Sequence, residues 1–575
     1  MAQGSGGAAA LEALGAIPHG QDVRYRGEGW WRDTTYIDDF LAVVAAQPDK
    51  VAIVGHRADP VPSVTTLSYR QLGHLVDRFA GALLDLGVAP GDIVSIQLPN
   101  DWVFAALVLA CGRIGAVANP LVPILRDREV TFMLGRTASP VVIVADRYRG
   151  YDHAAMLDRV LTGTAGRADA DQPGRTVRGF AVGVEAPVGR VEPFDPHFLD
   201  HRWEDTLDRA ALAERALGPD DLAELQFTSG TTGEPKGVMH TPNTIYAGTR
   251  AFAEIGGLTA DDSVLMPSTL AHQTGFLIGI VMPLSTGMKV VYQDLWNAEL
   301  FCRLADDEQV TFSAGATPFL TDIVAECQRR GRRLRSMHSY VCAGAPIPSP
   351  LVEAAKDDAV GELIAVWGMT ENGGVTSTVP GSPTEVVADS DGLPVPWMET
   401  RIVAQDDPTT EVPVGGVGRL LVRGASQTAG YFKRPDLYQA QLSGGDDGLG
   451  PWFDTGDLAR RRADGGIRIA GRTKDLVIRG GENVPVVEVE AVLFGHPRVK
   501  EVAVIGYPDD RLGERACAVV VPDGEPPTLA DLTAFLDEAG MARQFWPERL
   551  EVVAEMPKTP SGKIQKFHLR SQFNS

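Results

Sequence analysis

The sequence predicts an α/β protein with a large layered N-terminal domain, which carries a β subdomain, and a small α+β C-terminal domain. Helical patterns alternate with short apolar β-type runs over the first four hundred residues, as in layered domains with largely parallel strands. From about residue 475, helical and strand-like runs interleave over about 100 residues. At 575 residues the chain is also too long for one core.

The large domain is predicted over residues 26–473, after a flexible tail over residues 1–25. Apolar residues at helical spacing predict helices in YRQLGHLVDRFAGALLDLG (69–87) and AALVLACGRIG (105–115). Strands are predicted in DIVSIQLPN, PVVIVAD, SVLMP, KVVYQ and HSYVCAG. Residues 160–195, rich in Gly, Asp, Arg and Pro, predict a surface excursion, and GRLLVRG (418–424) belongs to the expected β subdomain.

The small domain is predicted over residues 474–575. VVEVEAVLFGH and TLADLTAFLDEAG are expected to be helices, the second with Thr528 as its N-cap. KEVAVIGY, RACAVVVP and RLEVVAEM are expected to be strands. The join near IAGRTKDLVIRGGEN is a candidate hinge, because glycines and charged residues separate the two patterns.

Composition excludes several functional classes. A formal charge of −22 argues against nucleic-acid and anionic-membrane partners, which need a positive surface. The longest apolar runs are interrupted by charged residues and proline, so no membrane span is predicted. The N-terminus lacks the basic start and apolar core of a secretory signal. Five cysteines without paired spacing predict free thiols in a reducing cytoplasm.

The stretch TSGTTGEPKGV (228–238) has two interpretations. Small glycines, hydroxyl donors and Lys236 suit a loop that wraps phosphates, but Ser, Thr and Gly also cluster in ordinary surface turns. It is not a P-loop, because Gly230 and Gly233 are three apart and Gly237 follows the lysine. TPSGKIQK, near Lys563, also fails that test. On the stretch alone, both interpretations stay open.

Five further segments occur with it in order: LAHQTGF (270–276), CAGAPIP (342–348), WGMTENGG (367–374), WFDTGDLARR (452–461) with GRTKDLVIRGGEN (471–483), and PKTPSGKIQK (557–566). Together the six segments resemble those of the adenylate-forming superfamily, which includes acyl-CoA synthetases, adenylation domains and beetle luciferases. The resemblance covers residues 30 to 570. It implies an AMP-forming acid–thiol ligase that uses ATP, Mg²⁺ and coenzyme A.

The resemblance also implies roles for individual residues. Glu371 would bind Mg²⁺, Thr370 would bond the α-phosphate, and Lys563 would bridge the substrate carboxylate and the α-phosphate. Trp367 stands where the family most often has Tyr, a departure that the sequence leaves unexplained. The nucleotide-binding residues would be Thr228, Ser229, Gly230, Thr231, Thr232, Gly233, Lys236, Ala343, Gly344, Ala345, Trp367, Gly368, Met369, Asp457 and Arg472.

Asp457 would accept both ribose hydroxyls, with a buried Arg472–Asp457 pair as the alternative interpretation. In this family the small domain is mobile and rotates after adenylation, so Lys474 would be the hinge rather than an ordinary exposed lysine. Coenzyme A would pass Gly480, Gly481, Glu482 and Asn483.

The acid pocket would be lined by His272, Gln273, Thr274, Gly275, Phe276 and Gly315. His272, also a catalytic candidate, could equally be a structural histidine. The pocket region has no acidic residue to hold an ammonium group, so an amino acid substrate is not expected.

The resemblance favours a small cyclic or aromatic acid, with a medium-chain fatty acid as the alternative. A carrier protein is an alternative thiol acceptor, and luciferase-like oxidation or a non-catalytic homologue are further alternatives. A homodimer remains open.

Overall fold

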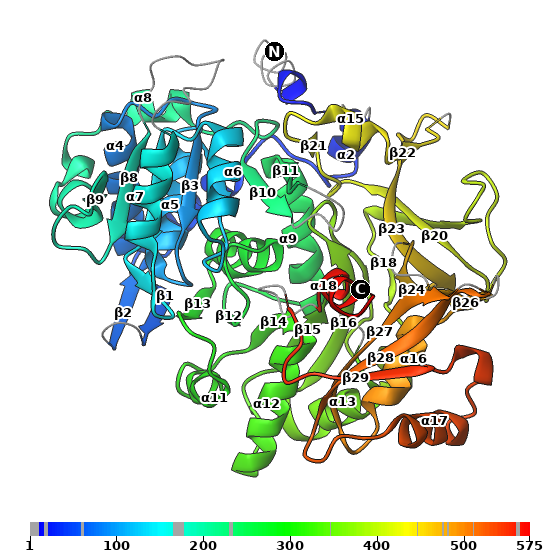
Figure 1. Cartoon of the computed structure of the whole chain (residues 1–575). Coiled ribbons are helices and arrows are strands. Elements are labelled where there is room, and N and C mark those ends of the chain that lie inside the picture. Colours follow the sequence, from blue (N-terminus) through cyan, green and yellow to red (C-terminus); the bar gives the residue numbers. More distant parts are fainter. Residues whose placement is uncertain are drawn as a thin grey trace.

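The computed structural model describes residues 11–16, 21–58, 62–164, 177–228, 234–344, 347–445, 447–473, 477–479, 482–509, 511–558 and 564–574. Within them, the large layered domain, the β subdomain and the small α+β unit predicted from the sequence are present (Figure 1). No helix in these ranges is both long and apolar enough to cross a membrane.

The first sheet has eight strands in the order β21-β11-β10-β4-β3-β5-β8-β9. The pairings from β10 through β9 are parallel, whereas β11 pairs antiparallel with β10, and β21 pairs antiparallel with β11. The strands are β3 (Ile93–Gln97), β4 (Val117–Pro120), β5 (Val141–Ala145), β8 (Arg178–Val182), β9 (Val191–Pro193), β10 (Glu224–Thr228), β11 (Lys236–His240) and β21 (Gly430–Tyr431).

The second sheet has nine strands in the order β18-β17-β16-β15-β14-β12-β13-β1-β2. The pairings between β1 and β16 are parallel. At the edges, β2 pairs antiparallel with β1, β17 with β16, and β18 with β17. The strands are β1 (Val51–Arg57), β2 (Ser63–Ser68), β12 (Ser263–Met266), β13 (Lys289–Gln293), β14 (Phe312–Ala316), β15 (Ser339–Ala343), β16 (Glu362–Met369), β17 (Gly373–Ser377) and β18 (Leu393–Pro394).

Helices cover these two sheets, and α5 (Trp102–Arg113) contacts strands of both. Nearly every residue of α5 is buried, which explains why its sequence is apolar all round. The other large-domain helices are α2 (Asp22–Gly27), α3 (Tyr36–Ala46), α4 (Tyr69–Asp85), α6 (Asp127–Thr137), α7 (His153–Thr164), α8 (Arg209–Arg215), α9 (Pro242–Gly256), α10 (Met282–Thr286), α11 (Ala298–Asp307), α12 (Thr317–Arg330), α13 (Ser349–Ala354), α14 (Thr384–Asp389) and α15 (Pro435–Gln439).

An antiparallel sheet forms the β subdomain, with β19 (Met398–Val403), β20 (Val417–Gly424), β22 (Leu442–Ser443), β23 (Trp452–Arg461) and β24 (Ile467–Arg472). The small unit has a sheet of β25 (Val477–Arg479), β26 (Glu482–Val484), β27 (Val499–Asp509), β28 (Gly513–Pro522) and β29 (Arg549–Val552). It is packed with α16 (Val486–Phe494), α17 (Leu529–Glu538) and α18 (Lys566–Phe573). Thr528 caps α17, as predicted, by accepting from the Asp531 backbone N–H.

Two expectations need revision. The surface excursion predicted over 160–195 is wrong for β8 and β9, because these strands extend the first sheet and bury Phe180 and Val191. Within the expected N-terminal tail, Ala16 forms a β-bridge with Gly430 and Tyr25 is buried, so part of that segment packs on the large domain.

The five cysteines are free and buried.

Asn100 ties the two large sheets together just after β3. Its buried amide donates to the carbonyl oxygens of Met266 (3.3 Å) and Ser268 (2.9 Å), and accepts from the Leu270 N–H (2.8 Å). Met266 is the last residue of β12, in the other sheet, and Ser268 and Leu270 follow that strand. A single amide thus satisfies three backbone groups of the segment that leads to His272.

We expect Asn100→Ala to lower the free energy of unfolding by about 2–4 kcal/mol, because it leaves buried backbone groups unpaired. Urea denaturation of the full chain measures this change. Gln328→Ala is the control, since this exposed amide bonds only an aspartate side chain, Asp358. Equal decreases in the free energy of unfolding in the two variants would contradict a stabilising role for the Asn100 hydrogen bonds between the sheets.

Candidate nucleotide and acid site

The predicted nucleotide residues come from three sheets. Thr228 and Lys236 are Cα partners where β10 ends and β11 begins, and residues 229–233 between them lie outside the described ranges. Trp367, Gly368 and Met369 end β16, and Thr370 and Glu371 form the turn before β17. Asp457 and Arg472 are Cα partners on β23 and β24. Folding therefore places three distant segments around one region.

Glu371 is the buried acid of this region, with a residue exposure of 7%. Its Oε1 accepts from the Tyr431 hydroxyl at 2.8 Å, and its carbonyl oxygen accepts from the Thr428 N–H at 2.6 Å. Burial raises the pKa of the Glu371 carboxyl, while the Tyr431 hydrogen bond and the charges of Lys236 and Arg472 oppose that rise. The site therefore already contains the cations that favour a carboxylate here.

Tyr431 was not predicted from the sequence. Its ring lies under the Lys236 ammonium, 4.6 Å from Nζ to the ring centroid, so it contacts the lysine and the acid together. The contact depends on β21, which pairs Tyr431 with Val238 of β11. No local spacing could have shown this, because nearly two hundred residues separate the two strands in sequence.

His240 was also missed. Its Nε2 lies 2.7 Å from the Thr370 carbonyl oxygen, and its Nδ1 lies 3.0 Å from the Thr244 hydroxyl. The ring is buried between the end of β11 and the turn that carries Glu371. His240 therefore holds the backbone of Thr370.

Trp367 contacts Asp457, which explains what an indole can do at this position. The indole Nε1–H donates to Asp457 Oδ2 at 3.0 Å. Arg472 Nε lies 3.1 Å from Oδ1, an ion-pair distance without hydrogen-bond geometry, so Oδ1 accepts no hydrogen bond within the described residues. The predicted Arg–Asp alternative thus exists as a charge contact and leaves an acceptor atom at the site.

Ala343 and Gly344 follow one another at the end of β15, and Ala345 lies outside the described residues. Gly344 has φ +87°, and a Cβ added there would meet nothing within 4 Å. A flat group could therefore approach this backbone closely.

The predicted acid-pocket residues point in different directions. His272 is half-buried, whereas Phe276 is fully buried in the main hydrophobic core. Gly275 admits no side chain, because a Cβ would lie 2.0 Å from the Thr269 carbonyl oxygen. A π-helix (η3, Gly275–Val281) begins there, a geometry frequent at functional sites. Gly315 lies at β14, where a Cβ would be 2.5 Å from the Tyr340 hydroxyl.

Gln273 is buried and faces β10. In the amide orientation that satisfies both ends, its nitrogen donates to Gln226 Oε1 at 2.9 Å and to the two Glu224 oxygens at 3.2 and 3.3 Å. The structure therefore brings Gln273 to a buried carboxyl that sequence reasoning did not single out.

Several predicted residues of the small unit lie outside the described ranges: Lys474, Gly480, Gly481 and Lys563, with the side chains of Glu482 and Asn483. The chain on either side of Lys563 is anchored. Lys558 pairs with Glu501 at 2.6 Å, and Lys566 pairs with Glu490 at 2.7 Å.

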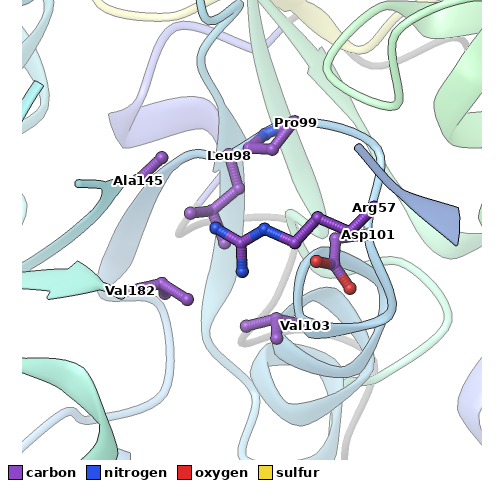
Figure 2. Close-up of a pocket in the computed structure, with 7 residues that line it drawn as sticks. All are labelled: Arg57, Leu98, Pro99, Asp101, Val103, Ala145 and Val182. Carbon is purple, nitrogen blue, oxygen red and sulfur yellow. The ribbon is translucent and has the colours of Figure 1, made fainter. Parts of the chain in front are cut away.

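A small cavity lies elsewhere in the molecule (Figure 2). Arg57 extends between Leu98, Val103 and the β5 and β8 ends, with Asp101 beside its stem. Four strands separate β1, which ends at Arg57, from β16, which carries Trp367. This cavity is thus distinct from the nucleotide region.

Comparison with known proteins identifies the family. Residues 40–432 match the family described as AMP-binding enzyme, and residues 488–563 match the AMP-binding enzyme C-terminal domain. The chain is 32% identical over 550 residues to the medium-chain fatty-acid–CoA ligase of Escherichia coli K12, covering 95% of this chain and 92% of the relative.

Two other likenesses are informative. The salicyl-AMP ligase / salicyl-S-ArCP synthetase of Mycobacterium tuberculosis H37Rv is 31% identical over 556 residues, covering 96% of this chain and 93% of that protein. The structure of the anthranilate CoA ligase AuaEII in complex with anthranoyl-AMP matches with a TM-score of 0.80 at 25% identity, covering 94% of this chain and 97% of that one.

We expect Trp367→Phe to raise the KM for ATP by roughly 10- to 100-fold, because a hydrogen bond to the charged Asp457 is lost while an aromatic face remains. Steady-state kinetics at saturating acid measure the effect. Trp397→Phe is the matched control, since the buried Trp397 indole N–H has no hydrogen-bond partner within the described residues. The same KM in wild type and Trp367→Phe would contradict a role for this bond.

Proposed function

We propose that this chain, which belongs to the AMP-binding enzyme family, activates a carboxylic acid with ATP and transfers the acyl group to coenzyme A. In the first step a carboxylate oxygen attacks the α-phosphorus, and pyrophosphate leaves. In the second step the thiol sulfur attacks the acyl carbon, and AMP leaves. The gathering of Glu371, Lys236, Arg472 and Asp457 in one region carries this proposal.

The electrostatics suit the first step. An acid anion and a triphosphate must approach each other, so cations have to offset their repulsion. Lys236 and Arg472 act on the buried Glu371. Thr228 and Lys236, with residues 229–233 between them, would hold the departing pyrophosphate, and Asp457 would take the ribose.

Mg²⁺ fits the residues present. Glu371 offers a carboxylate whose Oε1 is already held by Tyr431. Across the described chain, no group of three or more His, Cys, Asp or Glu could hold a metal by itself. This donor set suits Mg²⁺, which commonly binds one or two carboxylates together with substrate phosphates. When bound, the ion would neutralise phosphate charge, and Tyr431 would orient Glu371 toward it.

The acid is proposed to be cyclic or aromatic. The structural likeness to an anthranilate CoA ligase supports an aromatic acid, and the E. coli relative supports a medium-chain fatty acid as the alternative. The M. tuberculosis relative supports a carrier-protein thiol as the alternative acceptor. The absence of an acidic residue in LAHQTGF argues against amino acids.

The experiment that tests this function is a pyrophosphate-release screen with benzoate, salicylate, cyclohexanecarboxylate, octanoate, palmitate and the amino acids, with and without coenzyme A. We expect release with a ring acid and thioester formation with coenzyme A. Release only with amino acids or only with palmitate would contradict the proposal. Thioester formation only on a phosphopantetheinylated carrier would favour the alternative acceptor.

We expect Lys563→Ala to slow adenylation by about a thousandfold, because one charge near 4 Å contributes roughly 4 kcal/mol at an effective dielectric of 20. Thioester formation from a synthetic acyl-adenylate should continue, since the rotated small domain would have withdrawn this lysine. Separate assays of the two half-reactions measure both. Lys500→Ala, an exposed lysine of the same unit, is the control. Equal loss of both half-reactions would argue against rotation.

A further inference from the structure

A buried carboxyl contacts the segment proposed to line the acid pocket and has no part in the mechanism above. Glu224 is the first residue of β10 and is fully buried. Its two carboxyl oxygens lie 3.2 and 3.3 Å from the Gln273 amide nitrogen. No ion pair to Glu224 is present among the described residues, and a buried acid without a charged partner is costly, so its retention calls for a reason.

Gln226 reinforces the same contact. It lies two residues after Glu224 on β10, so both side chains project from one face of the strand. Gln226 Nε2 donates to the Ala271 carbonyl oxygen at 2.9 Å, and Gln226 Oε1 accepts from Gln273 at 2.9 Å. The two β10 residues therefore hold Ala271 and Gln273, the neighbours of His272 on either side.

The surroundings keep this network neutral. Burial raises the pKa of Glu224 to about 8, and the Gln273 hydrogen bond opposes this rise. Among the described residues, the titratable groups beside it are the buried Tyr36 hydroxyl of α3, which itself neighbours Cys111 of α5, and His240, the Cα partner of Glu224 on β11. The His240 ring nitrogens contact Thr244 and Thr370.

We propose that Glu224 and Gln226 are positioning residues that fix Ala271–Gln273, and thereby His272, for binding of the substrate carboxylate. This inference rests on the proposed function. Protonated Glu224 leaves the wall behind the pocket neutral. Its ionisation would place a buried negative charge behind a site that must hold an anion, so acid binding would weaken as Glu224 loses its proton.

The decisive variant is Glu224→Gln, which keeps the size and the hydrogen-bond acceptor but cannot ionise. With benzoate or octanoate as the probe, we expect the wild-type KM for the acid to rise about fivefold between pH 8 and pH 9. The KM of Glu224→Gln for the acid should not show this rise over the same pH range. The KM for ATP should follow the same pH course in both proteins.

Weakening the network should act at every pH. Gln226→Leu removes one acceptor of the Gln273 amide and the side-chain donor to the Ala271 carbonyl oxygen, and should raise the KM for the acid at least tenfold with a smaller change in kcat. Asp101→Asn is the control at a half-buried carboxyl: desolvation raises the pKa of Asp101 too, but Asp101 lies at the cavity of Figure 2. Its pH course should match that of wild type.

A second readout does not need turnover. Between its ordinary value of 4.5 and about 8, folded Glu224 keeps a proton that the unfolded chain has lost. The thermal stability of wild type relative to Glu224→Gln should therefore fall as pH rises from 5 to 8 and level off above 8.

The outcomes separate the two proposals. If no acid in the screen is activated, the proposed function fails and takes this inference with it, whatever the melting data show. If benzoate or octanoate is activated but wild type and Glu224→Gln share one pH course for the acid KM, the inference alone is overturned. Equal changes in the KM for acid and for ATP in Gln226→Leu would also overturn it.

Discussion

The burial of Glu371 among charges of opposite sign is the constraint on which the nucleotide region depends. A carboxyl at this depth would resist ionisation, and here Tyr431, Lys236 and Arg472 each offset part of that cost. These three groups come from three different strands, β21, β11 and β24. The region can therefore form only when the first sheet, the second sheet and the β subdomain have docked.

Strand β10 connects the two halves of the expected chemistry. Its end, at Thr228, precedes the glycine-rich sequence that is expected to bind phosphate, and its beginning, at Glu224, contacts the segment of His272. Because a β-strand is stiff along its length, β10 would fix the position of the bound phosphates relative to that of the bound acid. Asn100 adds a second restraint, because its amide holds the backbone at 266–270 from the opposite sheet.

Local patterns predicted the elements well. The apolar spacing of α4 and the cap of α17 at Thr528 are local in sequence, and buried strands such as β3 and β5 are continuous apolar or nearly apolar runs. The prediction was wrong for β8 and β9, because the Gly, Asp and Pro residues around them indicated a surface segment rather than strands. The candidate site was predicted from the order of the motifs, and the roles of its residues in binding and catalysis are proposals.

The residue types and their order along the chain were enough to indicate the α/β class and the small second unit. The six segments, through their resemblance to the adenylate-forming superfamily, indicated a ligase that uses ATP. Tertiary structure alone decided that Tyr431 reaches Glu371, that Trp367 donates to Asp457, and that Gln273 faces Glu224. The reason is physical. Periodicity and capping are properties of neighbouring residues, whereas these three contacts join strands or turns 49 to 90 positions apart, and only sheet pairing and packing bring their side chains within hydrogen-bond distance.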